Sequence, residues 1–237
     1  RVAGGAVGSI GGARRRVAGI GQRADRLADR LGPGAVVLHS FLHGDIRPRG
    51  RKASVRRVST PEGARRAAAA GVELLAALQS RGGWWTDWRA GRGGSDEFAT
   101  ALVAVRISGA PGAGPLVRRA GEALDSRLVV RRASNLRGWG WSAAVPGDAD
   151  STAWAVRALA AADRPHPGHD VRDFLRGHVR DDGAATYADD AAVRRYMGRV
   201  YPEGHGFGGW TAASPSVTAA VAAAEPALAE ALVAALL

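Results

Sequence analysis

A repeating unit of two helical segments joined by a Gly- and Trp-rich turn occupies most of the chain from residue 59 onward. Each copy is anchored by a turn tryptophan and by Thr-Ala in the helical segment that follows: Trp84 with Thr100, Trp139 with Thr152, and Trp210 with Thr218. Repeats of this kind stack side by side, because one helix pair buries little apolar surface alone. Strand signals are sparse. The sequence therefore predicts an all-α fold of repeated helix pairs.

Capping residues set the expected helix ends. Ser59-Thr60-Pro61 places a proline in the first helical turn and predicts a helix from there to about Gln79. Glycines, prolines and further capping residues mark the remaining helical segments, expected at 95–107, 116–129, 151–162, 169–179, 189–200, 214–224 and 226–237.

The positive charge of the chain lies almost entirely in its first part. Of a formal net charge of +11, residues 1–66 hold 15 Lys and Arg against 4 Asp and Glu, whereas residues 67–237 hold 18 of each. We therefore expect a basic N-terminal segment over 1–58, partly disordered with one helix near 14–31, and a neutral repeat domain over 59–237. A basic segment can bind an anionic partner, but a solvated leader explains it more simply, and we assign no nucleic-acid binding.

Several protein classes are disfavoured by composition. There is no run of 18 apolar residues, so no membrane span is expected, and residues 1–12 lack the apolar core of a signal peptide. The chain contains no cysteine, which excludes thiolate metal ligands and disulfides. We expect a cytoplasmic protein.

Two acids stand directly ahead of an apolar helical run in the stretch Leu136–Leu159. Asp148 and Asp150 are followed by Ser151 and Thr152, although a helix start needs only one capping side chain. The stretch has a purely structural interpretation, in which Asp150 or Ser151 caps the helix and Asp148 forms an Asx-turn. It has a chemical one as well, because neighbouring carboxyl groups raise one another's pKa and a helix N-terminus stabilises the anion left after proton donation.

Asp-Ala-Asp-Ser-Thr-Ala between Gly-Trp turns resembles the terpenoid cyclase and protein prenyltransferase superfamily, over roughly Pro61–Leu237. The nearest resemblance is to squalene–hopene cyclases and class II diterpene cyclases, whose motif is Asp-x-Asp-Asp-Thr-Ala. It implies an α/α toroid (an α/α barrel) with a central cavity, Asp150 as the general acid and Asp148 as its partner. Ser151 stands where the family has its last acid, which alters the anchoring of the anion. The ring of such a toroid takes six helix pairs, and the sequence predicts about four.

The resemblance further implies a protonation-initiated cyclisation or isomerisation of an isoprenoid or another unsaturated, hydrophobic substrate. Such an enzyme is an isomerase or lyase of isoprenoid biosynthesis in secondary metabolism. Aromatic faces stabilise carbocations, and the candidates to line the cavity are Trp85, Trp141, Trp154, Tyr187, Tyr201, Phe207 and Trp210. With so few helix pairs the toroid is expected to be partial or open, completed by another copy in an oligomer or by a missing C-terminal part.

Two alternatives remain open. The altered motif at Ser151 and the shortage of helices fit a non-catalytic binding or scaffold protein that keeps the repeat. Asp148, Asp150 and His205 could instead hold a divalent metal in a transferase or lyase, since carboxylates and imidazole suit harder metals. Otherwise no cofactor is expected.

Overall fold

The computed structural model describes residues 60–87, 89–90, 93–197 and 206–235. The helix expected near 14–31 and two candidate site residues, Tyr201 and His205, lie outside these ranges. The chain divides into two compact units, residues 1–74 and residues 75–237. The domain boundary expected after residue 58 stays a prediction.

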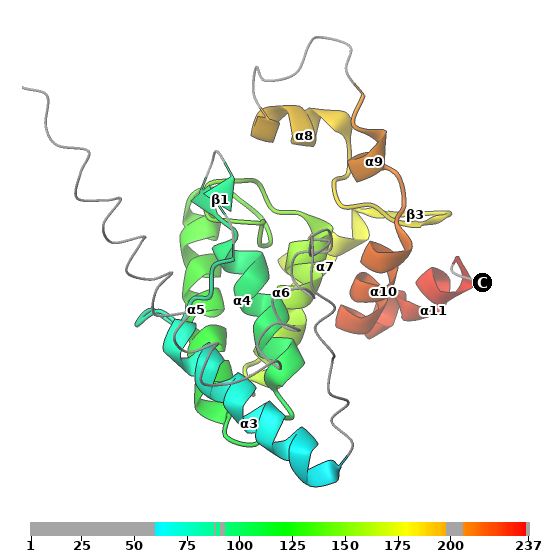
Figure 1. The fold of residues 1–237 in the computed structure, drawn as a ribbon. Helices are drawn as coiled ribbons and strands as arrows, with labels where there is room; N and C mark the ends of the chain where they lie inside the picture. The colour runs from blue at the N-terminus through cyan, green and yellow to red at the C-terminus, as the bar shows by residue number, and fades with distance from the viewer. Residues whose placement is uncertain (1–59, 88, 91–92, 198–205, 236–237) are drawn as a thin grey trace, which may run out of the picture. The chain divides into compact units, whose positions relative to one another are not determined.

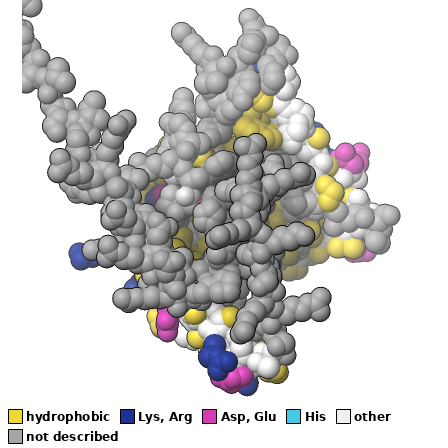
Figure 2. Space-filling model, in the orientation of Figure 1, with side chains coloured by type: hydrophobic (Ala, Val, Ile, Leu, Met, Phe, Trp, Pro, Cys, Tyr) yellow, Lys and Arg dark blue, Asp and Glu magenta, His cyan; other side chains and the backbone are white. Residues whose placement is uncertain are grey.

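Helix α3 (Pro61–Leu78) supplies all the described structure of the first unit, up to Leu74. Thr60 caps it, because its Oγ1 accepts a hydrogen bond from the Gly63 N–H at 3.1 Å. Glu62 in the first turn forms exposed ion pairs with Arg65 and Arg66. Figure 2 shows basic and acidic side chains together where α3 begins. The helix starts where Pro61 predicts.

The second unit is helical, with two short hairpins (Figure 1). Its helices are α4 (Asp96–Ile107), α5 (Gly114–Ala133), α6 (Ala149–Ala161), α7 (His169–Arg176), α8 (Asp190–Met197), α9 (Gly208–Thr211), α10 (Pro215–Ala224) and α11 (Pro226–Ala234). The hairpins pair β1 (Arg89–Ala90) with β2 (Gly93–Gly94) and β3 (Val179–Arg180) with β4 (Gly183–Ala184), both antiparallel. The all-α prediction is confirmed. Among the described residues, no helix has both the length and the apolar character needed to cross a membrane.

Helix α6 lies between α4 and α10. Alanines that are fully or almost fully buried line the three helices and allow close approach: Ala101 and Ala104 in α4, Ala153, Ala155 and Ala158 in α6, and Ala220 in α10. Helix α5 packs against α4 and α6, α7 against α6, and α11 against α10. This succession of adjacent helices, each backed by a second one, is the helix pairing of an α/α toroid.

A threonine in each of these central helices forms a hydrogen bond with backbone from an earlier part of the chain. The Trp85 N–H donates to Thr100 Oγ1 at 2.9 Å, and the Trp139 N–H donates to Thr152 Oγ1 at 3.0 Å. Both hydroxyls donate back to the carbonyl of the same tryptophan. In the third copy the Ala184 N–H donates to Thr218 Oγ1 at 2.9 Å.

The repeat therefore has different anchors from those expected. Trp85, and not Trp84, is the counterpart of Trp139, and Ala184, and not Trp210, fills the position in the third copy. The indoles of Trp85 and Trp139 are buried and donate to the carbonyls of Leu75 and Leu124 in the preceding helices. The feature that recurs is a backbone N–H that donates to the threonine. The spacing of tryptophans in the sequence does not reveal it.

Glycine is required directly before two of these anchors. Gly138 has a φ of +61° and Gly183 a φ of +130°. A Cβ at Gly138 would overlap Thr152 Oγ1, and a Cβ at Gly183 would overlap Thr218 Oγ1. The close approach of turn and helix thus depends on the missing side chain.

Candidate functional site

Asp148 caps the N-terminus of α6. Its Oδ1 accepts from the Ser151 N–H at 2.7 Å, and its Oδ2 accepts from the Ser151 hydroxyl at 2.8 Å. The residue is only 3% exposed. The structural interpretation that placed Asp150 or Ser151 at the cap is therefore wrong. The helix starts at Ala149, whose N–H donates to the Thr186 carbonyl at 2.9 Å.

Burial raises the pKa of Asp148 to about 7. The two hydrogen bonds from Ser151 and the positive charge of Arg131 lower that pKa, whereas the neighbouring Asp150 carboxylate raises it further. Asp148 is thus a carboxyl group that changes charge near neutral pH while remaining enclosed.

Asp150 occupies a different environment two residues further on. It is half-buried in the first turn of α6, and burial raises its pKa while a hydrogen bond from the Trp154 side chain lowers it. The carboxyl group is therefore both reachable and held by a donor one turn along the helix. Of the two motif acids, Asp150 is the one placed to meet a ligand.

Asp150, Trp154 and Arg157 lie on one face of α6, which we call the α6 stripe. All three are half-buried, whereas most of the residues between them are fully buried. The guanidinium carbon of Arg157 lies 4.3 Å from the centroid of the Trp154 ring. Arg106 reaches the same ring from α4, at 5.4 Å. The stripe thus carries an acid at the helix start, an indole next to it and a positive charge at its far end.

A buried ion pair supports the turn that leads to Asp148. Glu97 in α4 is fully buried and accepts from Arg131 at 3.2 Å and from the Gly140 N–H at 2.8 Å. Arg131 also donates to the Val145 carbonyl at 3.0 Å. Burial raises the pKa of Glu97, and Arg131 and the Gly140 N–H oppose that rise. This pair was not predicted from the sequence. Glu97 lies in the first turn of α4 and Arg131 in the last turn of α5, where acidic and basic residues are common in any helix.

The other aromatic residues proposed to line a cavity are spread over several environments. Trp141 is half-buried in the turn before α6. Trp85 is buried, with its indole N–H engaged by Leu75. Tyr187 and Phe207 belong to a small buried cluster with Val193, and Trp210 is 41% exposed with its ring centroid 6.0 Å from that of Tyr187. Of the described aromatic candidates, Trp154 is the one that shares a helix face with Asp150.

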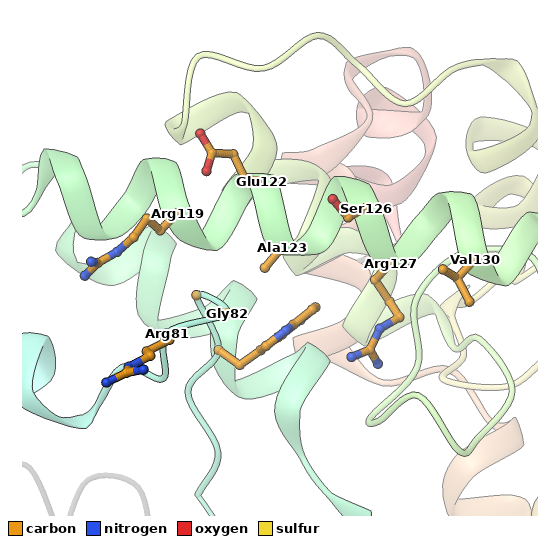
Figure 3. A pocket seen from close by; sticks show the side chains of 10 residues that line it. Arg81, Gly82, Arg119, Glu122, Ala123, Ser126, Arg127 and Val130 are labelled. Carbon is orange, nitrogen blue, oxygen red and sulfur yellow. The ribbon is translucent and has the colours of Figure 1, made fainter.

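A surface hollow of about 420 Å³ lies elsewhere, between α5 and the loop that precedes β1 (Figure 3). Arg119, Ala123 and Arg127 border it on α5, and Arg127 lies over the Trp84 ring at 4.4 Å. Neither Asp148 nor Asp150 lines this hollow. This hollow and the acid pair therefore lie at separate places in the described part of the chain.

In the described ranges, no group of three or more His, Cys, Asp or Glu side chains is arranged to hold a metal ion. Two members of the proposed metal set, Asp148 and Asp150, are described, whereas His205 is not. Metal binding by these three residues stays a prediction.

No protein-family model and no curated protein matches the chain. Solved structures do match. A variant of the type II terpene cyclase MstE from Scytonema, in complex with its substrate geranylgeranyl dihydroxybenzoate, is 26% identical with a TM-score of 0.59, covering 70% of this chain and 49% of that one. The same cyclase in its apo form is 28% identical with a TM-score of 0.56, covering 71% and 49%. A protein from Actinoplanes is 33% identical with a TM-score of 0.59, covering 71% and 50%. The chain spans about half the length of these neighbours.

Proposed function

Because the chain belongs to the terpenoid cyclase-like superfamily, we propose that it acts in a protonation-initiated cyclisation of a polyprenyl substrate, with Asp150 as the general acid. One observation carries this proposal: the two motif acids have different surroundings. Asp148 is enclosed and bound twice by Ser151, whereas Asp150 is half-buried on the same helix face as Trp154. Pairs of carboxyl groups in unlike environments are typical of acid catalysis.

The proton transfer follows from the chemistry of Asp150. Burial raises its pKa, which favours the protonated form that a general acid requires. The O–H bond of Asp150 breaks as a C–H bond forms at one alkene carbon, and the neighbouring carbon becomes cationic. The Trp154 donor and the positive end of the α6 dipole then stabilise the carboxylate. After ring closure, water accepts a proton from an adjacent carbon as a new double bond forms, and Asp150 regains a proton from solvent.

Asp148 and Ser151 would act as positioning residues. Asp148 fixes the start of α6, and with it the direction in which Asp150 points. When Asp150 becomes an anion, a neutral Asp148 avoids repulsion between two carboxylates, and its pKa near 7 permits this. Ser151 contributes a hydroxyl where related motifs place a third acid, so the site carries one negative charge fewer.

The substrate class follows from the surroundings of the acid. Trp154 places a large apolar ring beside Asp150, and a polyprenyl chain can pack against such a ring. The substrate of MstE, geranylgeranyl dihydroxybenzoate, is a polyprenyl compound. We propose a hydrophobic isoprenoid of similar length for this chain.

Turnover of geranylgeranyl dihydroxybenzoate and of simple polyprenyl compounds, followed by mass spectrometry, tests the proposal. Asp150→Asn is expected to abolish product formation, and Asp150→Glu to keep part of it. Asp182→Asn is the matched control, because Asp182 is an exposed acid in a turn. Full turnover by Asp150→Asn would contradict the assigned role.

A non-catalytic binding protein is the second candidate. It is favoured by the complete engagement of Asp148 in helix capping, since its two carboxyl oxygens both accept from Ser151. In that case the wild-type protein would bind polyprenyl ligands and form no product, and Asp150→Asn would leave the affinity unchanged.

A further inference from the structure

We propose that Arg106 and Arg157 form, around Trp154, a subsite that binds the anionic head group of the substrate, a carboxylate or a phosphate. The inference rests on the proposed function, since it assigns a second part of the same ligand to the far end of the α6 stripe.

The two arginines converge on one side chain from different helices. Their guanidinium carbons lie 5.4 Å and 4.3 Å from the same indole centroid, so they are at most 9.7 Å apart. Burial and the charge of Arg106 lower the pKa of Arg157. Two like charges held this close repel each other, and an anion between them would relieve that repulsion.

Arg157 is half-buried and Arg106 is exposed, whereas several other half-buried or fully buried arginines have acidic partners. Arg131 and Arg127 pair with Glu97, Arg172 pairs with Glu225, and Arg164 pairs with Asp125. Within the described ranges, no ion pair involves Arg106 or Arg157. The positive charge at this end of the stripe is therefore available to a ligand.

The chemistry of the pair suits an oxyanion. A guanidinium group presents a planar fork of N–H donors that matches a carboxylate or a phosphate, and stacking on an indole holds that fork in a fixed orientation. An ammonium group would give neither property. The subsite thus recognises the head group by shape as well as by charge.

The spacing along α6 connects the subsite to the acid. Arg157 follows Asp150 by seven residues on the same helix face, which corresponds to about 10 Å along the axis. A ligand with its anionic group at Arg157 would place a polyprenyl chain beside Trp154 and a distal double bond at Asp150.

Binding measured by titration calorimetry tests the proposal without requiring turnover. The probes are geranylgeranyl dihydroxybenzoate, its neutral methyl ester, geranylgeranyl diphosphate and neutral geranylgeraniol. We expect Arg106→Gln with Arg157→Gln to weaken the anionic probes roughly 10- to 100-fold, as for the loss of charged hydrogen bonds. The neutral probes should change less than about twofold. Arg157→Lys should retain part of the affinity, and Arg118→Gln, at an exposed position on α5, should retain all of it.

The two anionic probes decide between a carboxylate and a phosphate head group. Equal weakening of neutral and anionic probes, or no preference of the wild-type protein for an anion, would overturn the proposal. The same titrations with Asp150→Asn separate the two claims. If anion-selective binding persists while the wild-type protein forms no product, the proposed reaction fails and the subsite stands.

Discussion

Arg131 and Glu97 contact each other at 3.2 Å inside the protein, although they belong to different helices and lie 34 residues apart. Their side chains also bind the backbone of the turn before α6, at Val145 and Gly140. The acid motif is therefore positioned by residues that have no place in the motif itself.

Removal of either Arg131 or Glu97 should strongly reduce the stability of the folded protein. Arg131→Met leaves Glu97 with less compensation in a buried site, and we expect a loss of about 3 to 5 kcal/mol in the free energy of unfolding. Arg132→Met is the matched control, because the neighbouring Arg132 pairs with Asp170 at an exposed position and should cost no more than about 1 kcal/mol. Urea denaturation measures both, and equal losses would contradict the supporting role.

The hydroxyl group of Thr152, which binds the backbone of Trp139, should contribute to folding stability. Thr152→Val keeps the shape but leaves the Trp139 N–H and carbonyl without a partner in a buried place, so we expect a loss of about 1 to 3 kcal/mol. Thr152→Ser should recover most of it. A similar loss is expected for Thr100→Val, since Thr100 binds Trp85 in the same way. Unchanged thermal stability in both valine variants would contradict the repeat anchor.

Asp148 should make folding stability depend on pH. Its pKa rises from 3.8 to about 7 on folding, so its contribution is fully present below about pH 4 and is lost as the pH rises through 7. The full effect corresponds to about 4 kcal/mol. Asp148→Asn, which retains a capping side chain, should flatten the curve between pH 4 and 8. A variant curve parallel to that of the wild type would exclude Asp148 as its source.

Ser151→Ala should move the pH dependence of folding stability to higher pH. The Ser151 hydroxyl lowers the pKa of Asp148, because it donates to the carboxylate. Without it the carboxyl group should remain protonated at a higher pH, which shifts the midpoint of the stability curve upward. The Ser151 N–H bond to Asp148 does not involve the side chain and should persist, so the helix start is retained. An unchanged midpoint would count against this hydroxyl contact.

Trp154→Phe should alter the pH dependence of turnover. The substitution keeps an aromatic face but removes the donor that lowers the pKa of Asp150. The acid should then stay protonated to higher pH, and the alkaline limb of the rate profile should shift upward. Trp141→Phe, in the turn before α6, should leave that limb in place. If both variants behave alike, the hydrogen bond from Trp154 does not control the acid.

Local signals predicted the helix starts well, because capping and proline act within one turn. Pro61, Pro215 and Pro226 each stand at the first residue of a helix, as expected. The cap of α6 could not be chosen from sequence, since Asp148, Asp150, Ser151 and Thr152 are all residue types that cap helices. The spacing of tryptophans likewise could not show that the backbone of Ala184, which has no ring, completes the third copy.

The candidate site was only partly predictable, because its chemistry depends on burial. The acid pair stands out in the sequence, but the enclosure of Asp148 and the openness of Asp150 are products of packing. The arginines around Trp154 gave no signal, since Arg106 lies on another helix and meets the ring only in the folded protein.

The threonine anchors give each of the three central helices a comparable position against the preceding backbone. Phe98, Asp150 and Ser216 each stand two residues before the anchor threonine of their own helix. One residue therefore decides whether this position carries a reactive side chain, and each of the other two copies contains an equivalent position. Ser216→Asp or Phe98→Asp would place an acid at the equivalent position of a neighbouring helix. A new catalytic group can therefore arise here by a point substitution, without any new structural element.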